Sequence, residues 1–217
     1  MKLTRANAKA IKYACMKFHY AKAVPVNTLG YNVYNNAGEW CGVVVFGTGA
    51  TPNMARPYGL SQGEVLELVR VALNGKQEST SQAVGIALRL LKKDCPMCKL
   101  VISFADCDQN HIGTIYQATN WIYTGTNNAG ALGAFMIHGK KTHPKSVYAQ
   151  MVVIDGKKVH CPQTIEAVRK YLDPDATVFK TQGKRKYIYP LTKQMRVMAE
   201  SLRKPYPKKG DKQYETC

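Results

Sequence analysis

Two carboxylates, two amides and an imidazole lie close together in the segment 106–111, which reads DCDQNH. They follow residues 100–105, a short and mostly apolar run that predicts a strand buried on both faces. The carboxyl end of such a strand is where open α/β sheets bind their ligands. We therefore expect an active-site loop here. The alternative is that Asp106 only caps the helix that follows.

A tyrosine follows this loop at helical spacing. From Ile112 the apolar period becomes that of a helix, which we expect to end near Asn120 with Tyr116 on it. A phenol at this place can donate a proton. Trp121 and Tyr123 then begin a new strand or turn, and their rings are candidates for stacking on a nucleic-acid base. Packing in the core is the alternative for all three aromatic residues.

The elements that would position this segment begin with a hairpin. Two β-type runs within 29–48 are separated by the turn signal Asn-Asn-Ala-Gly at 35–38, which predicts antiparallel strands. Residues 64–73 suit a further strand, in which Arg70 belongs either to a structural pair or to the site. Arg56 lies in the Gly/Pro-rich stretch before that strand, a predicted surface loop of the kind that carries function.

A helix with a continuous apolar face at 83–91 follows, and Ser79 or Ser81 can cap it. The first amides of a helix lack intrahelical partners, so a helix that starts after a strand can bind a phosphate. We take Ser79, Ser81 and Arg70 as candidate cofactor-binding residues. Neither a Walker loop nor a GxGxxG fingerprint is present.

The two ends of the chain are basic. Residues 1–20 predict an amphipathic basic helix, and His19 at its end is either a packing residue or faces a substrate. The second half predicts strands at 131–137 and 147–154, a tight turn at 155–156, a helix at 162–172, a hairpin at 177–191 and a basic helical tail from 193.

Net charge is the strongest compositional signal. The 217 residues include 31 Lys plus Arg against 14 Asp plus Glu, a net +17, and residues 131–217 alone carry 18 basic and 7 acidic side chains. Such an excess usually neutralises a polyanion, and a solvated basic surface is the alternative. The candidate nucleic-acid contacts outside the aromatic residues are His19, Arg56, His111, Lys140, Lys141, Lys184, Arg185 and Lys186.

Cysteine usage and hydropathy exclude other classes. Seven cysteines are an odd number, no secretory signal is present, and no apolar run reaches the roughly 18 residues needed to span a bilayer. We expect a cytoplasmic, reduced protein without a membrane partner. Cys98 and Cys107 stand nine residues apart, about 30 Å of extended chain, so a zinc site built from them with Cys95 and His111 is not expected, and no metal is predicted.

These observations predict an α/β (α+β) fold in one domain over 1–217. It comprises a mixed central sheet flanked by helices, a basic helix at 1–20, a basic insertion at 140–180 and a partly disordered basic tail at 193–217. The order of elements resembles the core of GNAT acyltransferases. The segment 103–125, SFADCDQNHIGTIYQATNWIYTG, with FHYAKAVP upstream and GKRKYIYPL downstream, resembles the Mom family of phage DNA-modification proteins over nearly the whole chain.

The resemblance implies an enzyme that converts adenine in duplex DNA to its N-carbamoylmethyl derivative, which shields phage DNA from host restriction enzymes. It implies functional roles for Asp106 and Tyr116, and more loosely for Arg70, Ser81 and His19. In GNAT enzymes a tyrosine at this place often protonates the thiolate of coenzyme A. The usual pyrophosphate signature is replaced here by GKQESTSQAVG, so the acyl donor is either acetyl-coenzyme A or a glycyl ester, for instance glycyl-tRNA.

Three alternatives have different chemistry. A GNAT enzyme could acylate a small molecule or a protein, and a non-enzymatic protein could bind DNA through the same positive charge. An adenine methyltransferase is disfavoured because the sequence has no Asp/Asn-Pro-Pro-Tyr/Phe motif and no Gly-rich cofactor loop. The predicted partners are double-stranded DNA and tRNA as a donor, within the host cytoplasm, and the sequence does not define an oligomeric state.

Overall fold

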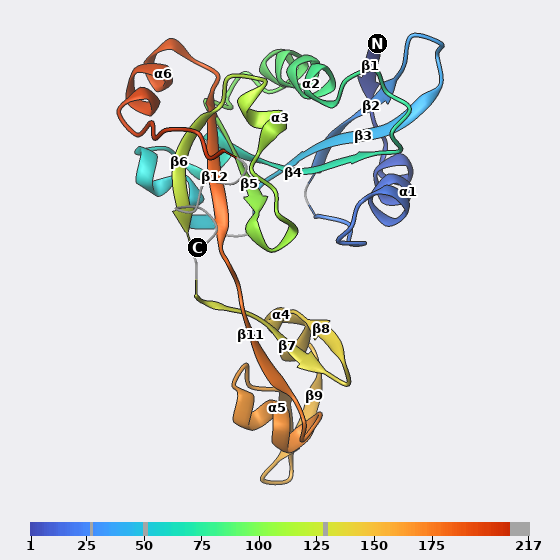
Figure 1. The fold of residues 1–217 in the computed structure, drawn as a ribbon, viewed down its shortest axis with the longest axis vertical. Helices are drawn as coiled ribbons and strands as arrows, with labels where there is room; N and C mark the ends of the chain where they lie inside the picture. Colours follow the sequence, from blue (N-terminus) through green and yellow to red (C-terminus); the bar gives the residue numbers. More distant parts are fainter. Residues whose placement is uncertain (27, 50–51, 128–129, 209–217) are drawn as a thin grey trace. The chain divides into compact units, whose positions relative to one another are not determined.

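The computed structural model describes residues 1–26, 28–49, 52–127 and 130–208, and the chain divides into two compact units (Figure 1). Among the described residues, the first unit comprises those within 1–105, 113–125 and 185–206, and the second comprises those within 106–112, 126–184 and 207–208. The sequence predicted one domain with a basic insertion at 140–180. That insertion lies inside the second unit, which has a hydrophobic core of its own.

The first unit is built on a seven-stranded sheet in the order β1-β2-β3-β4-β5-β12-β6. The strands are β1 (Lys2–Arg5), β2 (Thr28–Tyr34), β3 (Trp40–Gly47), β4 (Val65–Leu73), β5 (Leu100–Asp106), β6 (Ile122–Asn127) and β12 (Lys184–Pro190). Strands β1 to β4 pair antiparallel, whereas β4 and β5 pair parallel. The expected α/β class, a mixed central sheet flanked by helices, is confirmed.

Helices cover both faces of this sheet (Figure 1). Successive side chains of a strand point to opposite faces, and Val43 and Val45 of β3 pack with α1 (Ala8–Phe18). Val44 points the other way, as does its cross-strand partner Tyr31. The Tyr31 hydroxyl donates to Asp94 at the end of α2 (Thr80–Asp94) over 2.9 Å. α1 and α2 therefore lie on opposite faces.

The local signals of the first half predicted these elements well. The hairpin expected within 29–48 is β2 and β3, and Gly38 in its turn has φ +80°, a conformation that glycine adopts without strain. The expected helix at 1–20 is only partly right. Residues 2–5 form β1 on the edge of the sheet, and α1 starts after Asn7, whose side chain accepts from the Ala10 amide over 2.8 Å.

The last helices of the first unit are short. α3 (Thr114–Gln117) is shorter than the helix expected from 112 to 120, because Gly113 directly before it and Asn120 three residues after it both have positive φ. α6 (Lys193–Glu200) buries Met195 and Ala199 in the core. Residues up to 208 of the expected tail thus have a described structure, and 209–217 lie outside the described residues.

The second unit has two small sheets. Its elements are β7 (Leu132–Ile137), β8 (Lys140–Thr142), α4 (Pro144–Tyr148), β9 (Met151–Ile154), β10 (Lys157–His160), α5 (Ile165–Tyr171) and β11 (Thr177–Lys180). Strands β11, β7 and β8 form one sheet, and β9 and β10 form a two-stranded ribbon around the expected turn. Phe135, Val147 and Val168 are fully buried in its core.

Two sequence expectations were wrong in this half. The strand expected at 147–154 starts only at Met151, because Pro144 and the capping residue His143 begin α4 first. The hairpin expected at 177–191 does not form. β11 pairs with β7 in the second unit, whereas β12 lies between β5 and β6 in the first. No helix among the described residues is long and apolar enough to cross a membrane.

Candidate active site

The parallel pairing of β4 and β5 covers only three residue pairs. It ends at the pair Glu67 and Ile102, although both strands continue beyond that point. A bulge in the β3–β4 pairing lies between Val45 and Phe46, close to the same level of the sheet. Bulges are frequent beside active sites because they redirect side chains. The candidate site of the first unit begins where this ladder stops.

Ser103 is the first residue of β5 beyond the ladder. Its side chain is buried, with 1% of the residue exposed, and its hydroxyl lies 2.9 Å from the Leu68 carbonyl and 2.8 Å from the Tyr116 hydroxyl. A hydroxyl has one proton to donate. When Ser103 donates to Leu68 it accepts from Tyr116, and when it donates to Tyr116 the phenol proton is released for another acceptor.

Tyr116 is held by aromatic packing. It is buried, and its ring centroid lies 5.2 Å from that of Trp121 and 5.0 Å from that of Tyr187. Gly113, with φ +78°, precedes α3 and lies directly against the Tyr187 ring, where a Cβ would overlap the ring. Glycine is therefore required at this position to bring α3, and Tyr116 on it, onto the sheet.

The surroundings of the Tyr116 hydroxyl favour its protonated form. Burial raises the pKa of Tyr116 to about 12, and the carboxylate of Glu67 and the phenolate of Tyr20, once Tyr20 is ionised, act in the same direction, while the Ser103 hydrogen bond opposes them. The phenol therefore keeps its proton at neutral pH. It can donate that proton to a leaving group, and Ser103 can then donate to the resulting oxyanion.

In the second unit, the loop 106–112 starts with Asp106, the last residue of β5. The Asp106 side chain accepts from the Asp108 amide over 3.0 Å, and its carbonyl accepts from the His111 amide over 3.1 Å. Asp106 thus caps a 3-10 turn at Cys107–Gln109, which Asn110 closes in the left-handed conformation. The capping role weighed from the sequence is present, through one of the two carboxylate oxygens of Asp106.

Asp108 fixes this loop to the connection between β11 and β12. Its carboxylate accepts from the Gln182 amide over 2.8 Å and the Thr181 hydroxyl over 3.0 Å, and it lies 3.5 Å from the Lys141 ammonium. Burial acts to raise the pKa of Asp108, but these hydrogen bonds and the Lys141 charge outweigh it. The pKa of Asp108 therefore lies below its ordinary value.

Of the three candidate cofactor-binding residues, Ser79 and Ser81 come together and Arg70 lies apart from them. Arg70 is on the face that α1 covers, and it donates to the carbonyls of Ala23 over 3.4 Å and Val69 over 2.7 Å. Ser79 is the N-cap of α2 on the opposite face. Its hydroxyl lies 3.0 Å from that of Ser81 and accepts from the first turn of the helix.

One of the first amides at this helix start already has a side-chain partner. Ser79 already satisfies the Gln82 amide over 3.2 Å, and the Glu78 carboxylate stands directly before the cap. Glu78 accepts from the Asn36 amide over 2.6 Å, a hydrogen bond that lowers the pKa of Glu78 and keeps it negative. A carboxylate next to the cap in the sequence disfavours a second anion there.

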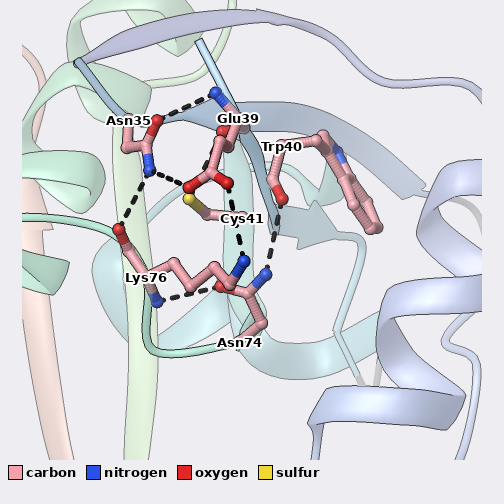
Figure 2. A network of polar contacts seen from close by, with 6 residues as sticks. All are labelled: Asn35, Glu39, Trp40, Cys41, Asn74 and Lys76. Atoms are coloured by element: carbon pink, nitrogen blue, oxygen red, sulfur yellow. Dashed lines mark hydrogen bonds and ion pairs between the residues drawn. The ribbon is translucent and has the colours of Figure 1, made fainter. Parts of the chain in front are cut away.

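The loop before α2 is tied to the hairpin turn of β2 and β3 by a polar network (Figure 2). The Asn35 amide donates to the Glu39 carboxylate over 3.0 Å and to the Lys76 carbonyl over 3.2 Å, and Lys76 pairs with Glu39 over 3.5 Å. Asn74 accepts from the Lys76 amide over 2.9 Å and donates to the Trp40 carbonyl over 3.4 Å. The network holds this loop in one conformation.

The residues predicted to contact the substrate fall into a buried group and an exposed group. Trp121 and Tyr123 are 0% and 2% exposed, so neither ring offers a face to a base, and their placement favours packing. Arg185 is also buried, and Lys186 is half-buried with its ammonium 4.9 Å from the Tyr58 ring centroid. Arg56, His111, Lys140, Lys141 and Lys184 are exposed.

His19 lies at the end of α1, where its ring stacks on Tyr20 at 4.4 Å and accepts from the Ala21 amide over 3.1 Å. Because Tyr20 acts on the pKa of Tyr116, this end of α1 belongs to the surroundings of the candidate proton donor. In the ranges that the structure describes, no group of three or more His, Cys, Asp or Glu side chains is placed to hold a metal ion.

The comparisons with known proteins agree with the sequence pattern. The family model described as the Mom protein family matches residues 1–208. The chain belongs to this family. No curated protein matches the chain.

Two solved acetyltransferase structures are similar to this chain at low sequence identity. An acetyltransferase of Bacillus subtilis in complex with CoA is 9% identical, with coverage of 88% of this chain and 97% of that one at a TM-score of 0.46. A mutant spermidine N-acetyltransferase from Vibrio cholerae is also 9% identical, with coverage of 91% and 99% and a TM-score of 0.46.

Sequence reasoning missed several residues around Tyr116. Ser103 lies in an apolar run that predicts only a strand, and neither Glu67 on β4 nor Tyr20 after α1 is among the predicted site residues. Asp108 was grouped with Asp106, although its hydrogen bonds give it an anchoring role. Polar residues inside apolar strands are the signal that would have pointed to Ser103, because a buried hydroxyl needs a partner.

Proposed function

We propose that this protein is a DNA-modification enzyme that converts the exocyclic amine of adenine in duplex DNA to its N-carbamoylmethyl derivative and so protects phage DNA from restriction. The match of residues 1–208 to the Mom protein family carries this proposal. The net charge of +17 supports a polyanionic substrate. The buried, protonated phenol of Tyr116 supports a reaction that needs a proton donor at a leaving group.

The chemistry requires both a base and an acid. The amine of adenine is a poor nucleophile because its lone pair is delocalised into the ring, so a group must accept its proton as the new bond forms. In this proposal Asp106 accepts that proton. Tyr116 donates its own proton to the leaving oxygen or sulfur, and Ser103 stabilises the phenolate through its hydroxyl.

The target base must leave the helix to react. Flipping a base from the duplex costs about a few kcal/mol, which stacking in a pocket offsets. Tyr20 is 53% exposed, is stacked on His19 from one side and lies near Tyr116. We assign its ring, instead of the buried Trp121 and Tyr123, to stacking on the flipped adenine.

A glycyl ester fits the product better than an acetyl group as the donor. The carbamoylmethyl group, CH2-CO-NH2, contains a nitrogen that acetyl lacks and is an isomer of a glycyl group, CO-CH2-NH2. Attack of the adenine amine on a glycyl ester forms a C–N bond, breaks the C–O ester bond and releases the alcohol with a proton. Glycyl-tRNA carries such an ester, and the usual pyrophosphate signature of GNAT enzymes is replaced in this chain by GKQESTSQAVG.

Rearrangement of the glycyl adduct then gives the product without loss of atoms. The free amine of the glycyl group attacks C6 of the purine and closes a five-membered ring. Cleavage of the bond from C6 to the original amine leaves the glycine nitrogen on C6 and turns the original amine into the carboxamide. Acetyl-coenzyme A with a separate nitrogen source is the competing route.

Mass spectrometry of nucleosides tests the proposal directly. DNA from cells that express the protein should contain a new adenine species, whereas DNA from cells with an Asp106→Asn, Tyr116→Phe variant should not. Growth on glycine labelled at carbon and nitrogen should place both labels in this species. Absence of any new adenine species contradicts the proposed function, and label from acetate in its place contradicts only the glycyl donor.

A further inference from the structure

The helix α1 has an outer face of unusual composition. Its inner face buries Ile11, Ala14 and Cys15 against the sheet. The outer face lines a shallow hollow of about 410 Å³, formed by Lys9, Lys12, Tyr13, Met16 and Lys17. Tyr13 and Met16 are 55% and 46% exposed although they belong to a folded helix. Apolar side chains in a concave surface with lysines around them indicate a binding surface.

Tyr13 is fixed in place before any partner binds. Its ring centroid lies 5.9 Å from that of Phe18 and 5.9 Å from that of Trp40. Phe18 and Trp40 are themselves 5.8 Å apart, and the Trp40 indole donates to Asn32 over 3.0 Å. A ring that its neighbours already orient loses little conformational entropy on binding.

The charge around this hollow is of one sign. Residues 1–38 contain six Lys and Arg side chains and no Asp or Glu. Among the described residues, Lys9, Lys12 and Lys17 make no ion pair with any carboxylate. Their positive charge is therefore uncompensated, and it complements a partner with regularly spaced negative groups.

We infer that the outer face of α1 binds a single-stranded segment of nucleic acid, with a base on Tyr13 and Met16 and phosphates on Lys9, Lys12 and Lys17. Unstacked bases offer flat apolar faces that stack on aromatic side chains, and the backbone follows a positive surface. A duplex hides those faces inside its stack, so it would leave the hollow unfilled. An acidic peptide would satisfy the lysines but would leave Tyr13 and Met16 exposed.

This inference goes beyond the proposed function, which concerns adenine in duplex DNA. It concerns binding alone and does not depend on which reaction the protein catalyses. The experiment is fluorescence anisotropy with a labelled 12-nucleotide oligo(dT) or oligo(U), with a 12-base-pair duplex and inorganic polyphosphate as competitors. The single strand should bind more tightly than polyphosphate, because only the single strand can stack.

Substitutions in α1 distinguish the contribution of base stacking to single-strand binding from the contribution of charge. Stacking of one base is worth about 1–3 kcal/mol, so Tyr13→Ala should weaken single-strand binding by about 5- to 150-fold. It should leave duplex binding within about twofold of wild type. A variant with Lys9, Lys12 and Lys17 changed to Gln should lower the slope of log affinity against log salt by about 0.7 for each phosphate lost.

Tyr148→Ala provides the matched control, because Tyr148 is 49% exposed and belongs to the second unit. It should bind the single strand like wild type, and circular dichroism should show that all variants are folded. The inference is overturned if wild type and Tyr13→Ala bind the single strand with equal affinity. It is also overturned if Tyr13→Ala loses as much affinity for the duplex as for the single strand, or if the wild type binds polyphosphate as tightly as the single strand. A dimer in light scattering that Tyr13→Ala dissolves overturns it in favour of a second copy of the chain.

Discussion

The Tyr116 hydroxyl and the Asp108 carboxylate belong to segments that are adjacent in the sequence, but their surroundings shift the two pKa values in opposite directions. The Tyr116 hydroxyl in the first unit is surrounded by rings and has the Ser103 hydroxyl as its polar partner, and burial raises its pKa to about 12. The Asp108 carboxylate in the second unit accepts from Gln182 and Thr181, and its pKa is lowered. Packing keeps a proton in place in the first segment, and hydrogen bonding keeps a charge in place in the second.

The comparison distinguishes a reacting group from an anchoring group. A donor must release its proton in the reaction, so it needs few hydrogen bonds in the ground state. An anchor gains stability from every hydrogen bond that it accepts. On this basis Tyr116 is the better candidate for chemistry, and Asp108 is the better candidate for holding the loop that begins with Asp106.

The largest expected effect is that of Tyr116→Phe. This change removes only the hydroxyl and keeps the ring against Trp121 and Tyr187. General acid catalysis contributes about 10²- to 10⁴-fold, so the rate of adenine modification should fall by at least about 100-fold. Quantitative nucleoside mass spectrometry over time measures the rate. A rate within about threefold of wild type, in a variant with unchanged melting temperature, removes Tyr116 from the mechanism.

Asp106→Asn should have an effect of similar or slightly smaller size. The amide oxygen can still accept from the Asp108 amide, so the turn at Cys107–Gln109 should form. The amide cannot accept a proton from adenine, and modification should fall by about 10²-fold or more. Gel-shift assays with duplex DNA should show binding close to that of wild type. Normal modification would assign Asp106 to capping alone.

Ser103→Ala should slow the reaction by about 10- to 100-fold through the loss of one hydrogen bond to the oxyanion. The turnover number should fall while KM stays unchanged, because Ser103 acts through Tyr116. The change should also cost about 1–3 kcal/mol of stability, since the buried Leu68 carbonyl loses its partner.

Ile102→Val is a stability control for Ser103→Ala. It lies on the same strand and removes one methyl group from the core at a cost of about 0.5–1.5 kcal/mol. A purely structural role for Ser103 predicts that both variants lose activity in proportion to their loss of stability. A positioning role predicts that only Ser103→Ala lowers the turnover number.

Asp108→Asn should destabilise the second unit by about 1–3 kcal/mol at neutral pH, because a charged acceptor of two hydrogen bonds is lost. The folded pKa of Asp108 is below its unfolded value of about 3.9. Its contribution is therefore fully present above that value and is lost as the pH falls through the folded pKa. Urea unfolding should show a difference between wild type and variant at pH 7 that narrows toward pH 3.

The smallest effect per residue is expected for exposed lysines of the second unit. If Lys140, Lys145 and Lys184 contact duplex phosphates, each change to Gln should reduce the slope of log affinity against log salt by about 0.9. Lys141→Gln is the matched comparison, because Lys141 already pairs with Asp108. An unchanged slope in the triple variant places the duplex on other parts of the protein.

Local signals explain which parts of the fold the sequence predicts. The turn at Asn35–Gly38 and the cap at Ser79 each depend on a few neighbouring residues, and the expected hairpin and helix formed around them. The region 177–191 depends on distant partners. Thr181 and Gln182 bind Asp108, and β11 and β12 pair in different sheets, which no local pattern around Gly183 indicates.

The candidate site follows the same rule. The placement of Asp106 at the end of a strand and of Tyr116 on the following helix could be predicted, because both follow from periodicity along one segment. The contact between Ser103 and Tyr116 spans 13 positions and forms only because α3 packs onto β5. The burial of Trp121 and Tyr123 likewise depends on β12 and on the segment after α6, which follow much later in the chain.

The chain's two tryptophans give each candidate site an optical signal of its own. Trp121 packs against Tyr116, and Trp40 packs against Tyr13 on the other side of the sheet. Indole emission changes in wavelength and intensity when nearby rings or solvent rearrange. Replacing either tryptophan by phenylalanine leaves a single fluorophore, so that binding at α1 and binding near Tyr116 can be followed separately, without an attached dye.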